Sequence, residues 1–198
     1  MKIPDKLNIY MASDFAVSEP RGENSDPDWT EHGVFGIGPD DSLYVIDWWS
    51  GQTTPDVWID SLLDLQAKHK PMCWFGEGGV IRRSIEPFLT KRARERRVYS
   101  RYEWLSPISD KATRGRAFQA RASMGKVIFP ASEPWSERVI DQCVAFPGGK
   151  HDDKFDVMSL MCLAIDQAHP AIVAKQEPRR VDRWRDAGVT QIERWKVV

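Results

Sequence analysis

The segment WTEHGVFGIGPDDSLYVIDWWSG, residues 29–51, contains two apolar stretches joined by the turn residues PDDS at positions 39–42. Aromatic and β-branched residues favour strands, and so short a turn joins two strands into an antiparallel hairpin. The preceding segment NIYMASDFAV, residues 8–17, has apolar residues on both faces, which is typical of a central strand. The sequence therefore predicts a three-stranded antiparallel meander at the start of the fold.

Helices and strands alternate after the meander. Residues 53–70 predict a helix with Thr54 as its cap and Pro55 in its first turn. Gly78 separates the next strand from a basic helix that Pro87 kinks or splits. The later elements are expected as strand 71–77, a helix to about Arg96, strand 98–105, helix 110–125, an extended piece over 127–130, helix 132–146 and helix 152–168. This order predicts an α/β fold with a mixed five-stranded sheet, the meander plus parallel strands, flanked by helices.

The length of 198 residues predicts one domain over residues 1–168 and a basic, tryptophan-containing tail over residues 169–198. The tail is either a docking arm or a flexible end, and the sequence leaves both open. No apolar run reaches the ~18–20 residues that span a bilayer, so no membrane contact is expected. The cysteines lie in apolar runs without CxxC spacing, so we expect reduced core thiols at Cys73, Cys143 and Cys162.

The net charge of −1 conceals a gradient along the chain. Residues 1–66 carry thirteen acids and three bases, residues 82–101 carry eight bases and two acids, and residues 111–126 carry five bases and no acid. A basic middle beside an acidic front suggests a polyanion held near an acid-lined site. The alternative is a solvated surface on which charges cluster without a ligand.

Two acids end apolar strands. Asp14 shares a strand face with Tyr10 and Ala12, and a buried aspartate is costly unless it is paired, hydrogen-bonded or bound to a metal. Glu77 ends the fourth strand directly before two glycines, at the kind of strand end where ligands often bind. An exposed strand end or an arginine partner for Asp14, and a turn position for Glu77, are the alternatives.

Three further acids crowd the start of the last helix, in FPGGKHDDKFDVMSLM at residues 146–161. Asp152 can cap this helix, and Asp153 and Asp156 suit the positive end of the helix dipole. The helix is apolar on nearly all sides, so its N-terminus should approach the sheet closely and its acids should face a cation. Carboxylates without a His/Cys motif favour Mg²⁺ or Mn²⁺ over zinc, and two such ions can hydrolyse a phosphodiester.

These pieces resemble the C-terminal nuclease domain of tailed-phage terminase large subunits, the DNA-packaging motor proteins, whose fold is ribonuclease H-like. The matching pieces follow the family's order over residues 7–168 and read YMASDFAVSE, DPDWT, YVIDWWSG, WFGE, DKATRGRAFQARASMGKVIFP and FPGGKHDDKFDVMSL. One family feature is missing: the chain has no GxxxxGK[ST] phosphate loop, so we expect no ATP hydrolysis from it. An excised domain or a separately encoded nuclease is implied.

The resemblance also implies roles for the acids. Asp14, Glu77 and Asp153 would be catalytic metal ligands that hold Mg²⁺ or Mn²⁺, as two ions. Asp152 would be a neighbouring ligand or an orienting group. Asp156 would lie behind the ligands or on the helix face.

Other residues would assist. Asp28 would help a metal-bound water or be an ordinary loop acid, and His151 would orient a phosphate, shuttle a proton or have no role. Basic side chains would contact DNA phosphates. They are drawn from Lys111, Arg114, Arg116, Arg82 and Arg83, with Lys91 and Arg92 in the wider pool. For Lys111 and Arg114, a salt-bridged helix N-terminus is the alternative.

Two classes of function follow. The first is a metal-dependent endonuclease that hydrolyses duplex DNA in the cytoplasm of an infected bacterial host, with the portal protein, the small terminase subunit and an ATPase domain as partners. The second is a non-catalytic DNA- or portal-docking module, which predicts salt-sensitive binding without cleavage. Within enzymes, a junction resolvase of the same fold would cut four-way junctions in preference to linear duplex.

Overall fold

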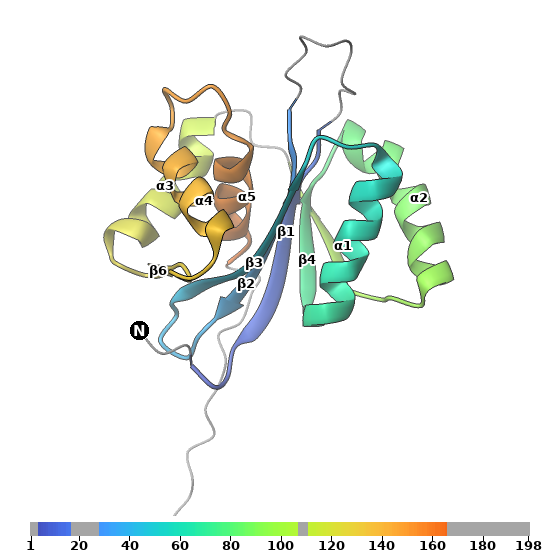
Figure 1. The fold of residues 1–198 in the computed structure, drawn as a ribbon, viewed down its shortest axis with the longest axis horizontal. Helices are drawn as coiled ribbons and strands as arrows, with labels where there is room; N and C mark the ends of the chain where they lie inside the picture. Colours follow the sequence, from blue (N-terminus) through green and yellow to red (C-terminus); the bar gives the residue numbers. More distant parts are fainter. Residues whose placement is uncertain (1–3, 17–27, 107–110, 166–198) are drawn as a thin grey trace, which may run out of the picture.

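The computed structural model describes residues 4–16, 28–106 and 111–165, which form one mixed sheet between two layers of helices (Figure 1). The strands are β1 Asn8–Asp14, β2 Thr30–Ile37, β3 Leu43–Gly51, β4 Cys73–Glu77, β5 Tyr102–Leu105 and β6 Val127–Ile128. The helices are α1 Pro55–His69, α2 Val80–Arg96, α3 Lys111–Ser123, α4 Pro134–Ala145 and α5 Asp153–Ala164.

The sheet order, β5-β4-β1-β2-β3-β6, brings the strand ends that carry acids together. β1, β2 and β3 form the antiparallel meander, β4 and β5 extend it in parallel from β1, and β6 pairs in parallel with β3. Ser13 lies opposite Gly76 in the parallel pair β1–β4, so Asp14 and Glu77, one residue further on, end at the same edge of the sheet. Asp14 also lies opposite Glu31, at the start of β2.

Each face of the sheet has its own helical layer. In Figure 1, α1 and α2 cover one face, and α3, α4 and α5 cover the other. Successive residues of β1 alternate between the two cores: Tyr10 and Ala12 pack on the side of α5, whereas Met11 packs on the side of α1 and α2. The strand is therefore apolar on both faces because both faces are covered.

The helix α5 lies directly on the sheet, where it contacts β1, β2 and β4. Its side chain Phe155 is buried and stacks on Phe146 with ring centroids 3.7 Å apart. The helix α3 crosses α5 at Gly115, where a Cβ atom would lie 2.4 Å from Cζ of Phe155. The absence of a side chain at Gly115 thus allows α3 to approach closely enough to carry its neighbour Arg114 to the sheet edge.

This close approach generates a stability prediction for Gly115→Ala. Alanine is favoured over glycine in a helix by about 1 kcal/mol. The clash with an immobile ring should outweigh that gain and leave a net destabilisation of about 1–3 kcal/mol. Urea unfolding measures it. Gly148→Ala is the control, because a Cβ there meets only an ordinary contact at 3.5 Å; equal stability of both variants would contradict the packing argument.

A buried polar chain ties β1, β2, β4 and α1 together. Trp74 Nε1 donates to Ser13 Oγ at 2.8 Å, and Ser13 Oγ donates to His32 Nδ1 at 2.8 Å. His32 Nε2 donates to the backbone carbonyl of Trp58 at 3.0 Å. Both ring nitrogens are therefore used by the neutral imidazole, and burial lowers the pKa of His32 to about 4.

The buried histidine predicts a loss of stability in acid. The unfolded chain binds the proton first as the pH falls, because its histidine titrates at 6.5 and the folded one at about 4. Above pH 6.5, neutral His32 makes its full contribution to the free energy of unfolding. This contribution is lower by about 2 kcal/mol at pH 5, and it continues to fall until the pH reaches about 4. Urea unfolding at pH 8 and pH 5 should show a loss larger by that amount in the wild type than in His32→Gln. An equal loss in both proteins would refute this assignment.

The predicted fold class is confirmed, with one correction to the strand count. The sheet has six strands, because the first two residues of the extended piece 127–130 pair with β3 as β6. The strand expected over 98–105 begins only at Tyr102, and Pro87 lies inside α2 without dividing it. All three cysteines are free, with Cys73 and Cys162 buried and Cys143 half-buried.

The predicted helix caps were wrong in detail. Thr54 and Asp152 occupy the N-cap positions of α1 and α5, but neither side chain makes a capping hydrogen bond. The tail predicted over 169–198 lies outside the described residues, as does the end of the predicted domain at 168. Among the helices of the described ranges, none is both long enough and apolar enough to cross a bilayer.

Candidate metal centre

Four carboxylates from three elements gather at one edge of the sheet. Asp14 ends β1, Glu77 ends β4, and Asp153 and Asp156 belong to the first turn of α5. The negative charges of Asp156, Asp153 and Glu77 each raise the pKa of Asp14, so these side chains act on one another across the edge. We call these four residues the acidic edge cluster.

Asp14 has the most perturbed carboxyl group of the cluster. Burial is the largest cause and the neighbouring carboxylates add to it, raising its pKa to about 8. The backbone N–H of Phe15 donates to Asp14 Oδ1 at 3.1 Å and opposes the shift. Without a cation, Asp14 therefore keeps a proton at neutral pH.

Asp153 is buried, with 6% of its surface exposed. Burial first, and then the charges of Asp28 and Glu31, raise its pKa to about 6, while the backbone N–H groups of Asp153 and Trp29 oppose the shift. Its Oδ2 atom accepts no hydrogen bond from any described residue, and His151 Nδ1 lies 3.8 Å from it. A buried carboxylate oxygen without a donor is costly, and the nearby charges of Asp28 and Glu31 add to that cost.

Arg114 lies among these acids. Its Nη1 donates to Glu77 Oε2 at 3.0 Å, and its Nη2 lies 3.6 Å from Asp156 Oδ1. Only 11% of the arginine side chain is exposed. In this arrangement Arg114 is paired with protein carboxylates, as the salt-bridge alternative for this residue expected, and is not presented on the surface to DNA.

A second buried ion pair supports the start of α5, and the sequence did not indicate it. Lys154 Nζ donates to Glu31 Oε1 at 2.6 Å, although Glu31 is 0% exposed. Trp48 Nε1 and Ser50 Oγ donate to the other oxygen of Glu31, at 2.6 and 2.5 Å. The ammonium group also lies 5.3 Å from the ring centre of Trp29. These contacts fix the residue next to Asp153 and so limit how far that carboxylate can move.

The remaining predicted residues are more scattered. Asp28 is exposed, yet its charge reaches Asp153. Arg82 is paired with Glu86 by a contact of 2.9 Å, whereas Arg83 and Arg116 are exposed. Asp152 is the residue before α5 and is half-buried, and Lys111 begins α3, with its side chain outside the described part.

The chemistry of the cluster fits a hard divalent cation. Its donors are carboxylate oxygens, which suit Mg²⁺ or Mn²⁺. Within residues 4–16, 28–106 and 111–165, no three acidic, histidine or cysteine side chains stand close enough to hold an ion as they are placed. Asp153 Oδ2 has no hydrogen-bond donor among the described residues, and neighbouring carboxylates raise the pKa of Asp14, so a divalent cation would neutralise charge that both groups carry.

Nuclease domains of phage large terminases are among the solved structures that share this fold. The large terminase nuclease from thermophilic phage G20c with bound magnesium has a TM-score of 0.56 and 14% identity, and the match covers 81% of this chain and 82% of that chain. The fold is that of a terminase nuclease domain. A nuclease domain of the large terminase subunit of bacterial virus Sf6, with manganese and beta-thujaplicinol, has a TM-score of 0.53 and 9% identity over 80% of this chain and 87% of that chain.

A longer solved structure shows what share of a large terminase this chain matches. The large terminase of a second thermophilic bacteriophage has a TM-score of 0.57 and 12% identity, and the match covers 82% of this chain but 40% of that chain. The chain therefore spans less than half of that terminase. No family model matches the sequence, and no curated protein sequence matches it.

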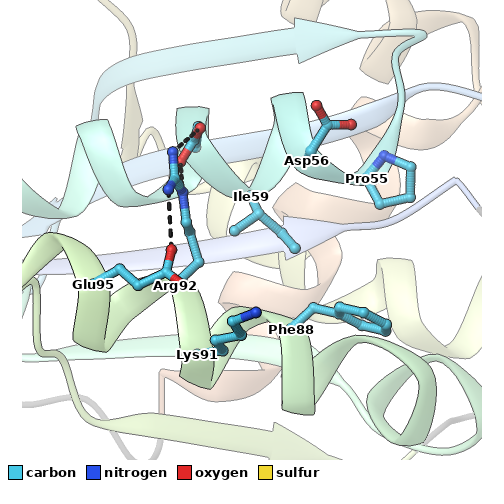
Figure 2. A pocket seen from close by; sticks show the side chains of 8 residues that line it. Pro55, Asp56, Ile59, Phe88, Lys91, Arg92 and Glu95 are labelled. Atoms are coloured by element: carbon cyan, nitrogen blue, oxygen red, sulfur yellow. Dashed lines mark hydrogen bonds and ion pairs between the residues drawn. The ribbon is translucent and has the colours of Figure 1, made fainter.

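One groove of the described part lies away from the acids. It measures about 550 Å³, lies between α1 and α2, and is lined by residues that include Ile59 and Phe88 (Figure 2). Arg92 is held there by Asp60 at 2.8 Å and by Glu95 at 3.1 Å. A smaller cavity of about 240 Å³ borders Glu77 and Arg114. The smaller cavity is therefore the one that adjoins the acidic edge cluster, and Arg92 is committed to structural ion pairs.

The acidic edge cluster predicts that Asp14→Asn stabilises the metal-free protein. Asparagine keeps the acceptor for the Phe15 N–H and removes the destabilised charge. The unfolded carboxyl titrates at 3.8 and the folded one at about 8, so the wild-type penalty is largest near pH 8 and disappears towards pH 4. We expect a gain of about 1–3 kcal/mol at pH 8 in a chelator.

Urea unfolding in EDTA at pH 8 and pH 4 measures this gain. Asp141→Asn, at an exposed position of α4, removes the same charge away from the cluster and should change the stability little. A destabilised Asp14→Asn protein at pH 8 would count against repulsion within the cluster.

Proposed function

We propose that the chain is a divalent-metal-dependent endonuclease that hydrolyses phosphodiester bonds of duplex DNA. The observation that carries this proposal is the acidic edge cluster at the joined ends of β1 and β4, on a fold shared with terminase nucleases. The terminase nucleases of phage G20c and virus Sf6, solved with magnesium and with manganese, support a divalent cation as the cofactor. Carboxylate donors make Mg²⁺ or Mn²⁺ the expected ions.

Three carboxylates are the proposed catalytic ligands. Asp14, Glu77 and Asp153 would hold two ions, with Asp152 as the neighbouring ligand or orienting group. Such ions, when bound, activate a water and stabilise the leaving oxygen of a phosphodiester. Asp14 must lose its proton to act as a ligand, and the Lys154–Glu31 pair holds the start of α5 so that Asp153 keeps its position.

Other groups would act around the ligands. His151, 3.8 Å from Asp153, would orient a phosphate or carry a proton, and Asp28 would position a water. The exposed bases Arg83 and Arg116, with Lys111 at the start of α3, would contact backbone phosphates and place the duplex without reading its sequence. Arg82 would join them only by exchanging Glu86 for a phosphate.

The proposed setting is genome packaging in the cytoplasm of a bacterial cell infected by a tailed phage. The nuclease would cut the packaged duplex, while ATP hydrolysis would come from an ATPase domain outside this sequence. The portal protein and the small terminase subunit are the partners that this role implies. The predicted domain over 1–168 would carry the cutting activity, and the tail over 169–198 would be free to serve docking.

Plasmid cleavage tests the proposal. Supercoiled plasmid with Mn²⁺ or Mg²⁺ should be nicked and then linearised, and EDTA should abolish cutting. Each of Asp14→Asn, Glu77→Gln and Asp153→Asn should lower the rate below about 1% of wild type, because each removes one charged ligand.

The control variant is Asp141→Asn, which should retain the wild-type rate. Intact plasmid after incubation with folded wild-type protein, together with salt-sensitive DNA binding, would replace the nuclease by the non-catalytic docking module. Selective cutting of four-way junctions would instead assign the same site to a resolvase.

A further inference from the structure

Arg114 carries a further inference, which rests on the proposed nuclease function and deepens it. The guanidinium pairs with Glu77 at 3.0 Å and lies 3.6 Å from Asp156. Glu77 is a proposed metal ligand, and the charge of Asp156 acts directly on Asp14. In the metal-free protein, the guanidinium of Arg114 therefore supplies positive charge beside the proposed metal ligand Glu77.

The guanidinium is not fully satisfied in this place. Its buried Nε–H has no acceptor among the described residues, and an unsatisfied buried donor costs about 1–3 kcal/mol. A cavity of about 240 Å³, lined in part by Leu105 and Leu160, borders both Arg114 and Glu77. The Arg114 side chain thus has space to move. When another cation neutralises Glu77, moving away would relieve the cost of its unsatisfied buried donor.

The helix that carries Arg114 cannot move with it. Gly115 packs against the buried ring of Phe155, so the backbone of α3 is held close to α5. Any displacement must come from rotation of the long arginine side chain. Its planar fork of donors can exchange a carboxylate for a phosphate and keep paired hydrogen bonds.

We propose that Arg114 is an exchangeable cation that couples metal binding to DNA binding. In the metal-free protein it neutralises Glu77 and Asp156. When divalent ions bind, Glu77 releases it, and the freed guanidinium binds a backbone phosphate of the duplex. Metal and DNA then each strengthen the binding of the other, as linkage requires.

A fixed structural clamp would behave in the opposite way. If Arg114 only held Glu77 in position, removing it would disorder a ligand and weaken metal binding. If it competes with the ions, removing it should strengthen metal binding. The sign of the change in Mn²⁺ affinity therefore separates the two roles.

Mn²⁺ titration without DNA is the first experiment. Calorimetry should give Arg114→Gln an affinity at least about fivefold higher than wild type, whereas Arg114→Lys, which keeps the charge, should return towards the wild-type value. Arg138→Ala removes the same charge from an exposed position of α4 and should leave the affinity unchanged. Thermal melts in Mn²⁺ and EDTA should show a larger metal-induced rise in Tm for Arg114→Gln.

The possible outcomes are distinct. Wild-type protein that binds no Mn²⁺ would overturn both the proposed nuclease function and the exchange. Wild-type protein that binds Mn²⁺, with unchanged or weaker binding by Arg114→Gln, would overturn the exchange alone and leave the nuclease proposal in place.

DNA binding is the second experiment. Ca²⁺ serves as the probe ion, and fluorescence anisotropy measures the affinity for a short duplex in Ca²⁺ and in EDTA. Ca²⁺ should raise the affinity of the wild type and of Arg138→Ala by about tenfold, but that of Arg114→Gln by less than about threefold. The same gain in all three proteins would show that Arg114 does not reach DNA and would overturn the coupling.

Discussion

Repulsion among carboxylates at the joined ends of β1 and β4 is the constraint on which the rest of the structure depends. The parallel pairing of these strands leaves no choice about where Asp14 and Glu77 lie, and α5 adds Asp153 and Asp156 to the same edge. Burial makes the negative charges of Asp14 and Asp153 more costly than they would be in water. The edge is therefore stable only if protons or cations balance the acids.

Two internal cations supply part of this balance in different ways. Lys154 is committed to Glu31, whose other oxygen is also occupied, so this pair acts as a fixed support for the start of α5. Arg114 is held more loosely, with one donor unsatisfied and a cavity beside it. We infer from this contrast that the Lys154–Glu31 pair is permanent and positions the start of α5. The Arg114–Glu77 pair, by comparison, can be exchanged. The proposed nuclease function would use both, because its metal ligands would be held in position while cations bind and leave.

The features that could be predicted from the sequence are those that one short segment determines by itself. The short turn at 39–42 indicated the hairpin, and an aspartate within an apolar strand indicated an unusual environment for Asp14. The two-residue strand β6 is too short to show a period, and the caps at Thr54 and Asp152 depend on rotamers that composition does not encode.

The ion pairs of the candidate site were not predictable in the same way. Glu31 and its partner Lys154 are 123 positions apart, and Glu77 and Arg114 are 37 apart, so only the packed fold brings them together. Every position of β2 is buried, so an acid within it needs a partner, but the sequence TEHGVFGI does not itself show that burial.

Anomalous diffraction from crystals soaked in Mn²⁺ tests the central claim most directly. Manganese peaks are expected between the carboxylates of Asp14, Glu77 and Asp153, with the guanidinium of Arg114 turned away from Glu77. Ordered carboxylates with no manganese between them, and Arg114 still paired to Glu77, would contradict it.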